Sequence, residues 1–143
     1  MSIEEEYPLD PLPKKFVPIL TKGYVCKVYD ADTITVISKL HDKGDYYRFS
    51  IRLTGIDTPE LRTKNLIEKK ISIEARDKLR ERILNKIVQL KTLTADKYGR
   101  LLCEVYYEGV YLNQWLLDEH YAVPYDGGTK HIPDNWEEYR NNR

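Results

Sequence analysis

Two acidic segments of the sequence could together bind a metal ion. Asp30 and Asp32 flank a short turn, and Asp57 and Glu60 follow a strand-like run further along the chain. Carboxylates at strand ends can converge on a hard cation such as calcium, which takes oxygen ligands from side chains, backbone carbonyls and water. Aspartate also favours plain turns, and a Thr-Pro pair is extended or turning without any ligand. The acids alone therefore leave a metal site and two ordinary turns both open.

Two arginines could bind a phosphate near these acids. Arg52 lies opposite the apolar residues of its predicted strand, so its side chain should leave the core and face a groove or solvent. At about 3.3 Å per residue, its position places it within roughly 15 Å of Asp57. Arg100 ends a predicted hairpin loop, after Gly99. Two guanidiniums aimed at one point would suit a phosphate whose charge grows in the transition state, although either arginine alone also fits a solvated surface charge.

Five predicted strands must position these residues. Runs rich in Val, Ile, Thr and Tyr predict strands at 23–29 and 33–39. Apolar and polar residues then alternate over 47–53, after a predicted turn at 41–45. Two further runs predict a hairpin, and a tight turn follows them; the strands are 88–94 and 101–107, and the turn is 107–109.

Helices are predicted between and after the strands. Ser72 is the expected N-cap of the first helix, with Glu74 in its first turn. Four apolar residues spaced four apart predict its buried face: Ala75, Leu79, Ile83 and Ile87. Residues 110–120 also have a helical pattern, and Asp134 could cap a last short helix after the Gly127-Gly128 break.

This order of elements predicts a small partly open barrel. Three strands, a helix, two strands and one or two further helices, with no internal repeat, are typical of the OB type, an α+β fold with a mainly β core. The 143 residues suit one domain, expected at 21–143. Residues 1–20 are expected to form an N-terminal arm with little structure of its own, since its first fifteen residues carry three glutamates and three prolines.

Composition narrows the class of protein without fixing its function. The formal net charge is zero, which argues against a protein that coats nucleic acid by charge but leaves room for an enzyme that grips a few phosphates. Apolar stretches are short, so no membrane span is expected. The acidic start lacks the order of a secretory signal, which favours an intracellular protein or a chain numbered after a removed piece.

Cysteine and histidine offer no metal chemistry in this sequence. Cys26 and Cys103 lie within strand-like runs and are predicted to be buried free thiols, because no secretion signal accompanies them. The three histidines are isolated from them and from one another, so no zinc site is expected: His41, His120 and His131.

Three segments together resemble the staphylococcal nuclease (thermonuclease) family. They read Asp-Ala-Asp-Thr at 30–33, Arg-Leu-Thr-Gly-Ile-Asp-Thr-Pro-Glu at 52–60 and Asp-Lys-Tyr-Gly-Arg at 96–100. The segments occur in the family's order with similar separations, and the resemblance covers roughly 23–125. It implies an OB barrel of five strands with about three helices, in agreement with the order of elements above.

The resemblance also implies a calcium site. Asp32 and Asp57 match the two carboxylates that bind calcium in the family, and Thr58 matches the residue that gives a backbone carbonyl. Asp30 matches a nearby acid that acts through the waters of the metal. Sites with so few acids bind calcium weakly, so we expect activity only where calcium is plentiful.

The same resemblance implies which three further residues act on the scissile phosphate and the attacking water. Arg52 and Arg100 match the pair that holds the scissile phosphate and stabilises its added negative charge. Glu60 matches the residue that positions or deprotonates the attacking water, and the sequence leaves these two roles open.

Substrate contacts beyond the scissile phosphate complete the predicted site. Lys97 and Tyr98 resemble residues that contact a neighbouring phosphate. The family stacks two tyrosines on the bound base, and here the comparable stretch offers Tyr125 and, less well placed, Tyr121. The family's bacterial members are typically secreted, and in this respect the sequence departs from the pattern.

The sequence therefore predicts a calcium-dependent nuclease that cleaves DNA and RNA with little sequence specificity. Single strands are expected to be preferred over duplexes, and a monomer is the expected state. The main alternative is a related domain that binds nucleic acid or protein without cutting, but such modules have typically lost the acids or arginines retained here. A plain OB-fold single-strand binder would need a basic groove without a carboxylate cluster.

Overall fold

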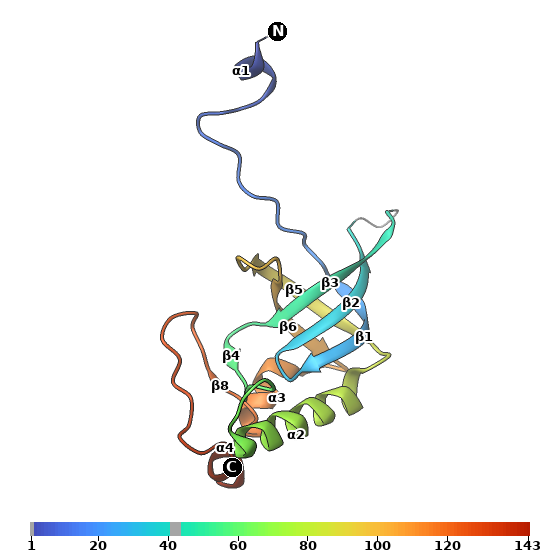
Figure 1. The fold of residues 1–143 in the computed structure, drawn as a ribbon. Helices are drawn as coiled ribbons and strands as arrows, with labels where there is room; N and C mark the ends of the chain where they lie inside the picture. The colour runs from blue at the N-terminus through green and yellow to red at the C-terminus, as the bar shows by residue number, and fades with distance from the viewer. Residues whose placement is uncertain (1, 41–43) are drawn as a thin grey trace.

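Five long strands close into a barrel. The computed structural model describes residues 2–40 and 44–143. Neighbouring strands follow the order β3-β2-β1-β5-β6, and β3 also pairs with β6, which closes the barrel (Figure 1). The predicted OB-type fold is thus confirmed. The strands are β1 (Lys22–Asp30), β2 (Thr33–Lys39), β3 (Tyr46–Leu53), β5 (Ile87–Ala95) and β6 (Leu101–Tyr107).

Apolar side chains that point inward at every second position of the strands fill the barrel. In β2, Ile34 and Val36 are buried while the residues between them are half-buried, as a period of two requires. Ile51 and Leu53 of β3 are likewise buried, which leaves Arg52 on the outer side of the barrel. The side chain that was predicted to leave the core therefore does so.

A short parallel ladder joins β3 to β6. Ile51 pairs with Leu101, Arg52 with Leu102 and Leu53 with Cys103. The ladder brings the end of β3 next to the start of β6, at the residue that follows Arg100. The two predicted phosphate-binding arginines are therefore held at one end of the barrel by backbone hydrogen bonds.

The long helix α2 (Leu66–Ile83) begins earlier than the sequence predicts. Asn65 is its N-cap, because its side chain accepts hydrogen bonds from the Ile67 and Glu68 amides. Ser72 is buried in the middle of the helix, and its hydroxyl has no hydrogen-bond partner in the described part of the chain. The prediction of a Ser72 cap was wrong, because the buried Ile71 comes before Ser72 and continues the four-residue apolar spacing back toward Asn65.

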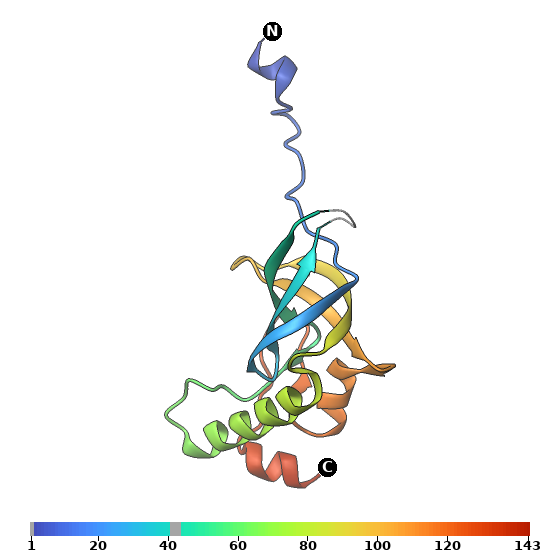
Figure 2. The same ribbon diagram turned by 90° about the vertical axis from the view of Figure 1, so that its right-hand side faces the viewer.

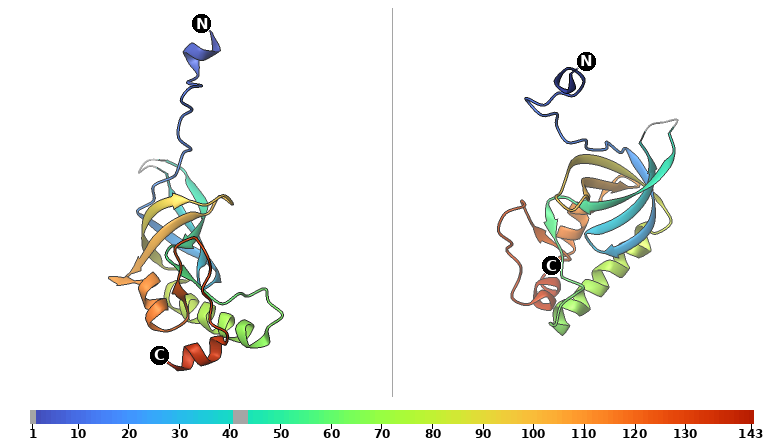
Figure 3. Two further views of the ribbon diagram at one scale, coloured as in Figure 1. Left: turned by 90° about the vertical axis from the view of Figure 1, so that its left-hand side faces the viewer. Right: turned by 45° about the horizontal axis from the view of Figure 1, so that its top comes forward.

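The buried face of α2 is otherwise as expected, up to its end. Ala75, Leu79 and Ile83 are fully buried against the barrel. Ile87 does not continue this face, because the helix stops at Ile83 and Ile87 starts β5 with 60% of its surface exposed. Figure 2 shows α2 lying across one end of the barrel, and Figure 3 shows the same arrangement from two further sides.

Two shorter helices complete the domain. Helix α3 (Leu112–Asp118) is shorter than the predicted 110–120, because β7 (Val110–Tyr111) takes the first two residues and pairs with β6. Helix α4 (Trp136–Asn141) is capped by Asn135, whose side chain accepts from the Glu138 amide, and not by Asp134. Both neighbouring residues are good caps, so sequence preference alone could not choose between them.

The two ends of the chain lie far apart. Residues 2–16 extend away from the barrel and include the one-turn helix α1 (Ile3–Glu6), whereas Val17 already packs against the core (Figures 1 and 2). Leu20 is buried, and its amide donates to the Thr92 hydroxyl 3.0 Å away. The predicted turn at 41–45 falls largely on 41–43, outside the described residues.

Both cysteines are free thiols, as predicted: Cys103 is buried and Cys26 is partly exposed. Within the described chain, no helix is long and apolar enough to cross a membrane.

One buried amide ties α3 to the barrel. The Asn113 Oδ1 accepts from the Val105 amide at 3.1 Å, and its Nδ2 donates to the carbonyls of Thr54 (2.8 Å) and Cys103 (3.2 Å). Asn113 is only 2% exposed, so its removal leaves the Val105 amide and the Thr54 carbonyl without this partner in the interior, while the Cys103 carbonyl still accepts from the Thr54 amide at 3.0 Å.

We therefore expect Asn113→Ala to lower the free energy of unfolding by about 2–4 kcal/mol. Urea unfolding followed by circular dichroism measures this, with the exposed Asn142→Ala as control. A loss below about 1 kcal/mol would show that the Val105 amide and the Thr54 carbonyl find other partners.

Candidate active site

The turn between β1 and β2 fixes the first acids. The Asp32 amide donates to the Asp30 carboxylate at 3.1 Å, and the Thr33 hydroxyl donates to the Asp32 carboxylate at 3.0 Å. The Leu53 amide donates to the Asp32 carbonyl at 2.8 Å, which ties this turn to the end of β3. Asp32 is 7% exposed, so its carboxylate lies almost wholly within the protein.

A second, two-stranded ladder fixes the other acid. Strand β4 (Ile56–Asp57) pairs with β8 (Val123–Pro124), and the Tyr125 amide donates to the Gly55 carbonyl at 2.9 Å. Asp57 and Thr58 are both buried. The ladder thus holds Asp57 and brings Tyr125 to the same end of the barrel.

Arg52 lies between the two buried carboxylates. Its Nη1 is 3.3 Å from the Asp32 Oδ2, and its Nη2 is 3.8 Å from the Asp57 Oδ1. Nη1 also donates to the Leu53 carbonyl at 2.9 Å. Only 12% of the Arg52 side chain is exposed, so water screens its charge little. Its single positive charge therefore acts strongly on the carboxylates of Asp32 and Asp57.

Arg100 is held by its own hairpin loop. The Asp96 Oδ1 accepts from the Tyr98 and Arg100 amides, each at 2.9 Å, and the Asp96 Oδ2 accepts from the Arg100 Nε at 2.7 Å. Burial alone would raise the pKa of Asp96, but the hydrogen bonds from Arg100 and Tyr98 outweigh it and lower this pKa. Gly99 takes a φ of 87°, which permits the tight turn.

Glu60 is more exposed than the other acids. Its backbone amide donates to the Glu68 carboxylate at 2.8 Å, which joins the loop after β4 to the first turn of α2. Its own side chain is 57% exposed and lies beside the buried pair. Glu60 is therefore free to contact water or a ligand.

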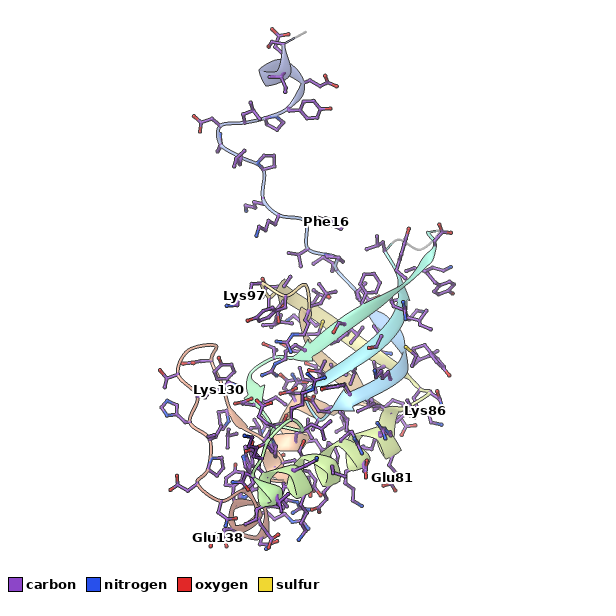
Figure 4. All side chains as sticks on the ribbon, viewed as in Figure 1. Phe16, Glu81, Lys86, Lys97, Lys130 and Glu138 are labelled. Carbon is purple, nitrogen blue, oxygen red and sulfur yellow. The ribbon has the colours of Figure 1, made fainter. Side chains whose placement is uncertain are left out.

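Lys130 is a residue of this site that the sequence did not predict. Its Nζ lies 3.6 Å from the Asp57 Oδ2 and 3.6 Å from the Glu60 Oε1. Burial alone lowers the pKa of Lys130, but the carboxylates of Asp57 and Glu60 outweigh it and raise this pKa. Figure 4 labels Lys130 on the loop that follows β8 and Lys97 on the β5–β6 hairpin. The sequence signalled only that Gly127-Gly128 breaks the chain before Lys130.

One cavity of about 540 Å³ gathers most of the predicted site residues. An adjoining hollow of about 550 Å³ shares Arg52, Tyr98, Arg100 and Tyr125 with it and adds Lys97. The predicted residues that line the first cavity come from five stretches of the chain: Asp30, Asp32, Arg52, Asp57, Thr58, Glu60, Tyr98, Arg100 and Tyr125.

Tyr121 does not reach this cavity. It is 1% exposed, its hydroxyl donates to the Glu74 carboxylate at 2.8 Å, and the Arg140 guanidinium lies 4.2 Å from its ring centre. The suggestion of Tyr121 as a second stacking residue was wrong, because the turn into β8 points it into the core.

Comparison with known proteins places this arrangement in a family. The model of the family described as "Staphylococcal nuclease homologue" matches residues 50–141, well over half of the chain. The chain belongs to this family. The matched range includes Arg52, Asp57, Glu60 and Arg100, while Asp32 enters the site through the β1–β2 turn.

Three relatives show how far the similarity extends. Endonuclease YncB of Bacillus subtilis is 33% identical over 112 residues, which cover 74% of this chain and 50% of YncB. An uncharacterised protein of Bacillus anthracis is 31% identical over 105 residues, 71% of this chain and 46% of its own length. The staphylococcal-like nuclease CAN1 of Arabidopsis thaliana is 32% identical over 78 residues, 54% of this chain and 22% of its own. The chain thus spans about half or less of these relatives.

The donor set of this family member suits a hard cation. Burial raises the pKa of Asp30 from 3.8 to about 8, with the nearby Asp32 carboxylate adding to the rise. Such crowding of acids is relieved when a cation binds beside them. No three or more Asp, Glu, His or Cys side chains form a metal-binding group among the described residues, so carbonyl groups and water would have to complete the shell.

Lys130 would compete for Asp57 with any cation that binds there, because its ammonium already pairs with this carboxylate. We expect Lys130→Met to tighten calcium binding about tenfold, because a half-exposed ammonium near a divalent ion is repelled by a few kcal/mol at most. Calorimetric titration with calcium measures the change, and the exposed Lys91→Met serves as control. Weaker calcium binding by Lys130→Met would mean that the ammonium supports the site instead.

Proposed function

We propose that this chain is a calcium-dependent nuclease that hydrolyses phosphodiester bonds of DNA and RNA with little sequence specificity. The observation that carries the proposal is the position of Arg52 between two buried carboxylates, in a cavity that Arg100 also lines. A site that only bound nucleic acid would gain nothing from buried acids, because they repel phosphates.

Asp32 and Asp57 would hold the calcium ion, with the Thr58 carbonyl as a third ligand and Asp30 acting through bound water. Calcium there supplies charge screening and Lewis-acid polarisation of the bound phosphate. Both carboxylates are nearly buried, so little water screens them and their attraction for a cation is strong.

Arg52 and Arg100 would bind the scissile phosphate. Each guanidinium offers paired donors in a fixed plane, which match phosphate oxygens and strengthen as negative charge develops. Arg52 is ion-paired with Asp32 and Asp57 and donates to the Leu53 carbonyl, and Arg100 donates to Asp96, so both are oriented before a substrate arrives. This preorganisation supports a role in the transition state.

Glu60 would orient the attacking water and accept its proton. Its exposed side chain borders the cavity, within reach of water, and the Lys130 ammonium lies beside it. Lys97 and Tyr98 would contact a neighbouring phosphate, and Tyr125 would stack on a base, since all three line the adjoining hollow.

Digestion assays test this function. Single-stranded DNA, single-stranded RNA and duplex DNA are incubated with the purified chain in millimolar calcium or in excess chelator. We expect cleavage of both single strands in calcium, slower cleavage of the duplex, and no cleavage in chelator or at submicromolar calcium. Binding without cleavage in calcium would favour a non-catalytic module, and sedimentation of the chain tests the expected monomer.

A further inference from the structure

The outer side of β1, β2 and β3 carries cations and tyrosines that the proposed reaction does not use. The three strands lie side by side in the barrel (Figure 1), and their inward residues, such as Val25 and Ile51, are buried. The register fixes which residues share the outer side. Starting from Arg52 at the cavity, the outward residues of β3 run to Tyr46 at the far end of the strand.

Three levels along this surface each combine one cation with one tyrosine. In the nearest level the Lys27 Nζ lies 5.9 Å from the Tyr29 ring centre, and in the farthest the Lys39 Nζ lies 4.8 Å from the Tyr46 ring centre. In the middle level Tyr24 of β1 and Arg48 of β3 flank Ile37 of β2 from opposite sides. We call the six residues the outer row: Lys27, Tyr29, Tyr24, Arg48, Lys39 and Tyr46.

The outer row concentrates positive charge in a chain whose net charge is zero. Three of its six members are cations and none is acidic. Lys27 and Arg48 form no ion pair with any carboxylate among the described residues. The positive charge of this surface therefore complements an anion. It would repel a basic protein or the same surface of a second copy of the chain.

The tyrosines of the outer row are exposed for stacking. Tyr46 is 67% exposed, Tyr24 is 40% exposed and Tyr29 is 38% exposed. An open hollow of about 660 Å³ lies over β2 and β3, lined by Tyr46, Arg48 and their neighbours. Aromatic faces beside cations are the combination that binds unpaired bases and their phosphates together.

The outer row is continuous with the cavity. Tyr29 lines the cavity itself, and Arg52 belongs to the same outer side of β3 as Arg48. The distance from Arg52 to Tyr46 along the strand is roughly 20 Å, which is enough for several nucleotides. Because β3 pairs with β2 along one edge and with β6 along the other, the outer row and the β5–β6 hairpin flank the cavity on opposite sides.

We propose that the outer row is a second binding site for single-stranded nucleic acid. It would hold nucleotides that flank the scissile phosphate on the side away from Lys97 and Tyr98. The proposal rests on the proposed nuclease function and extends it, since it makes long single strands better substrates than short ones. Duplexes fit less well, because their bases are stacked on one another and do not reach the tyrosines.

The test uses the double variant Tyr46→Ala/Arg48→Ala, in which both replaced side chains are exposed. Cleavage in calcium is measured on a trinucleotide and on a twenty-nucleotide single strand, and binding of the labelled long strand is measured in chelator. We expect the ratio of kcat/KM between long and short substrates, and the binding constant, each to fall about thirtyfold. The dependence of log binding on log salt should also become shallower by about 0.7.

Lys69→Ala, which removes one exposed cation from α2, should keep the ratio and the salt slope of the parent chain. If the parent cleaves both substrates and the double variant keeps its ratio and affinity, the outer row is not a binding site and the nuclease proposal stands. If nothing is cleaved but the double variant binds the long strand more weakly, the outer row stands and the nuclease proposal fails. Equal competition by duplex DNA would overturn the single-strand assignment.

Discussion

Arg52→Ala should lower kcat/KM on single-stranded DNA by about a thousandfold or more. The guanidinium lies in a cavity with little exposure, where its hydrogen bonds to a phosphate would strengthen as charge builds on the oxygens. Steady-state cleavage in saturating calcium measures the loss. Arg76→Ala is the matched control, because Arg76 is paired with Asp77 on α2, away from the cavity.

Loss of Arg52 also leaves the Asp32 carboxylate without its ion-pair partner and leaves Asp57 paired with the half-exposed Lys130 alone. Unpaired buried charges destabilise a protein by about 3–5 kcal/mol, so reduced activity alone could reflect unfolding. Arg52→Lys separates the two effects, because it keeps the positive charge and loses the planar pair of donors. We expect a folded protein, by thermal melting, with about a hundredfold loss of activity. Near-native activity of Arg52→Lys would contradict bidentate binding of the phosphate.

Glu60→Gln should reduce kcat by about a hundredfold to a thousandfold while KM changes little. The substitution keeps the shape of the side chain and removes its ability to accept a proton. Because the Glu60 side chain is more than half exposed, the fold should tolerate the change. Single-turnover cleavage measures the chemical step, and Glu81→Gln on the exposed side of α2 is the control.

The pH dependence of the same variant distinguishes proton transfer from positioning. If Glu60 takes the proton, the rise of kcat with pH in the acidic range should disappear in Glu60→Gln. A lower rate with an unchanged pH profile would mean that Glu60 only positions the water. Retention of more than about a tenth of the parent kcat would remove Glu60 from the mechanism altogether.

The barrel was predictable from the sequence because apolar and polar residues alternate over much of each strand, although irregularities in register interrupt β1 and β5. The alternation over 47–53 placed Arg52 outside the core, and the residue types around 95–100 and 107–109 located both turns. Helix starts were not predictable in the same way. Asn65 and Asn135 cap helices through side-chain hydrogen bonds, but Ser72 and Asp134 nearby are equally good capping types, so residue preference could not select the true start.

The candidate site was predictable only where its residues lie in recognisable segments. Arg52 and Arg100 could be named from those segments, but their approach depends on a parallel pairing between strands far apart in the sequence. Lys130 lies in a loop without a periodic pattern, and its contacts with Asp57 and Glu60 form only after β8 pairs with β4. Local spacing carries no information on such contacts.

The parallel ladder between β3 and β6 has a consequence for the folding of the molecule. Only three residue pairs form it, and they join segments some fifty positions apart, so its closure during folding is costly in chain entropy and slow. Arg52 and Arg100 come together only when this ladder has formed. During refolding, catalytic competence should therefore return with the closure of the barrel, after the local contacts of α2 and the β1–β2 hairpin have formed.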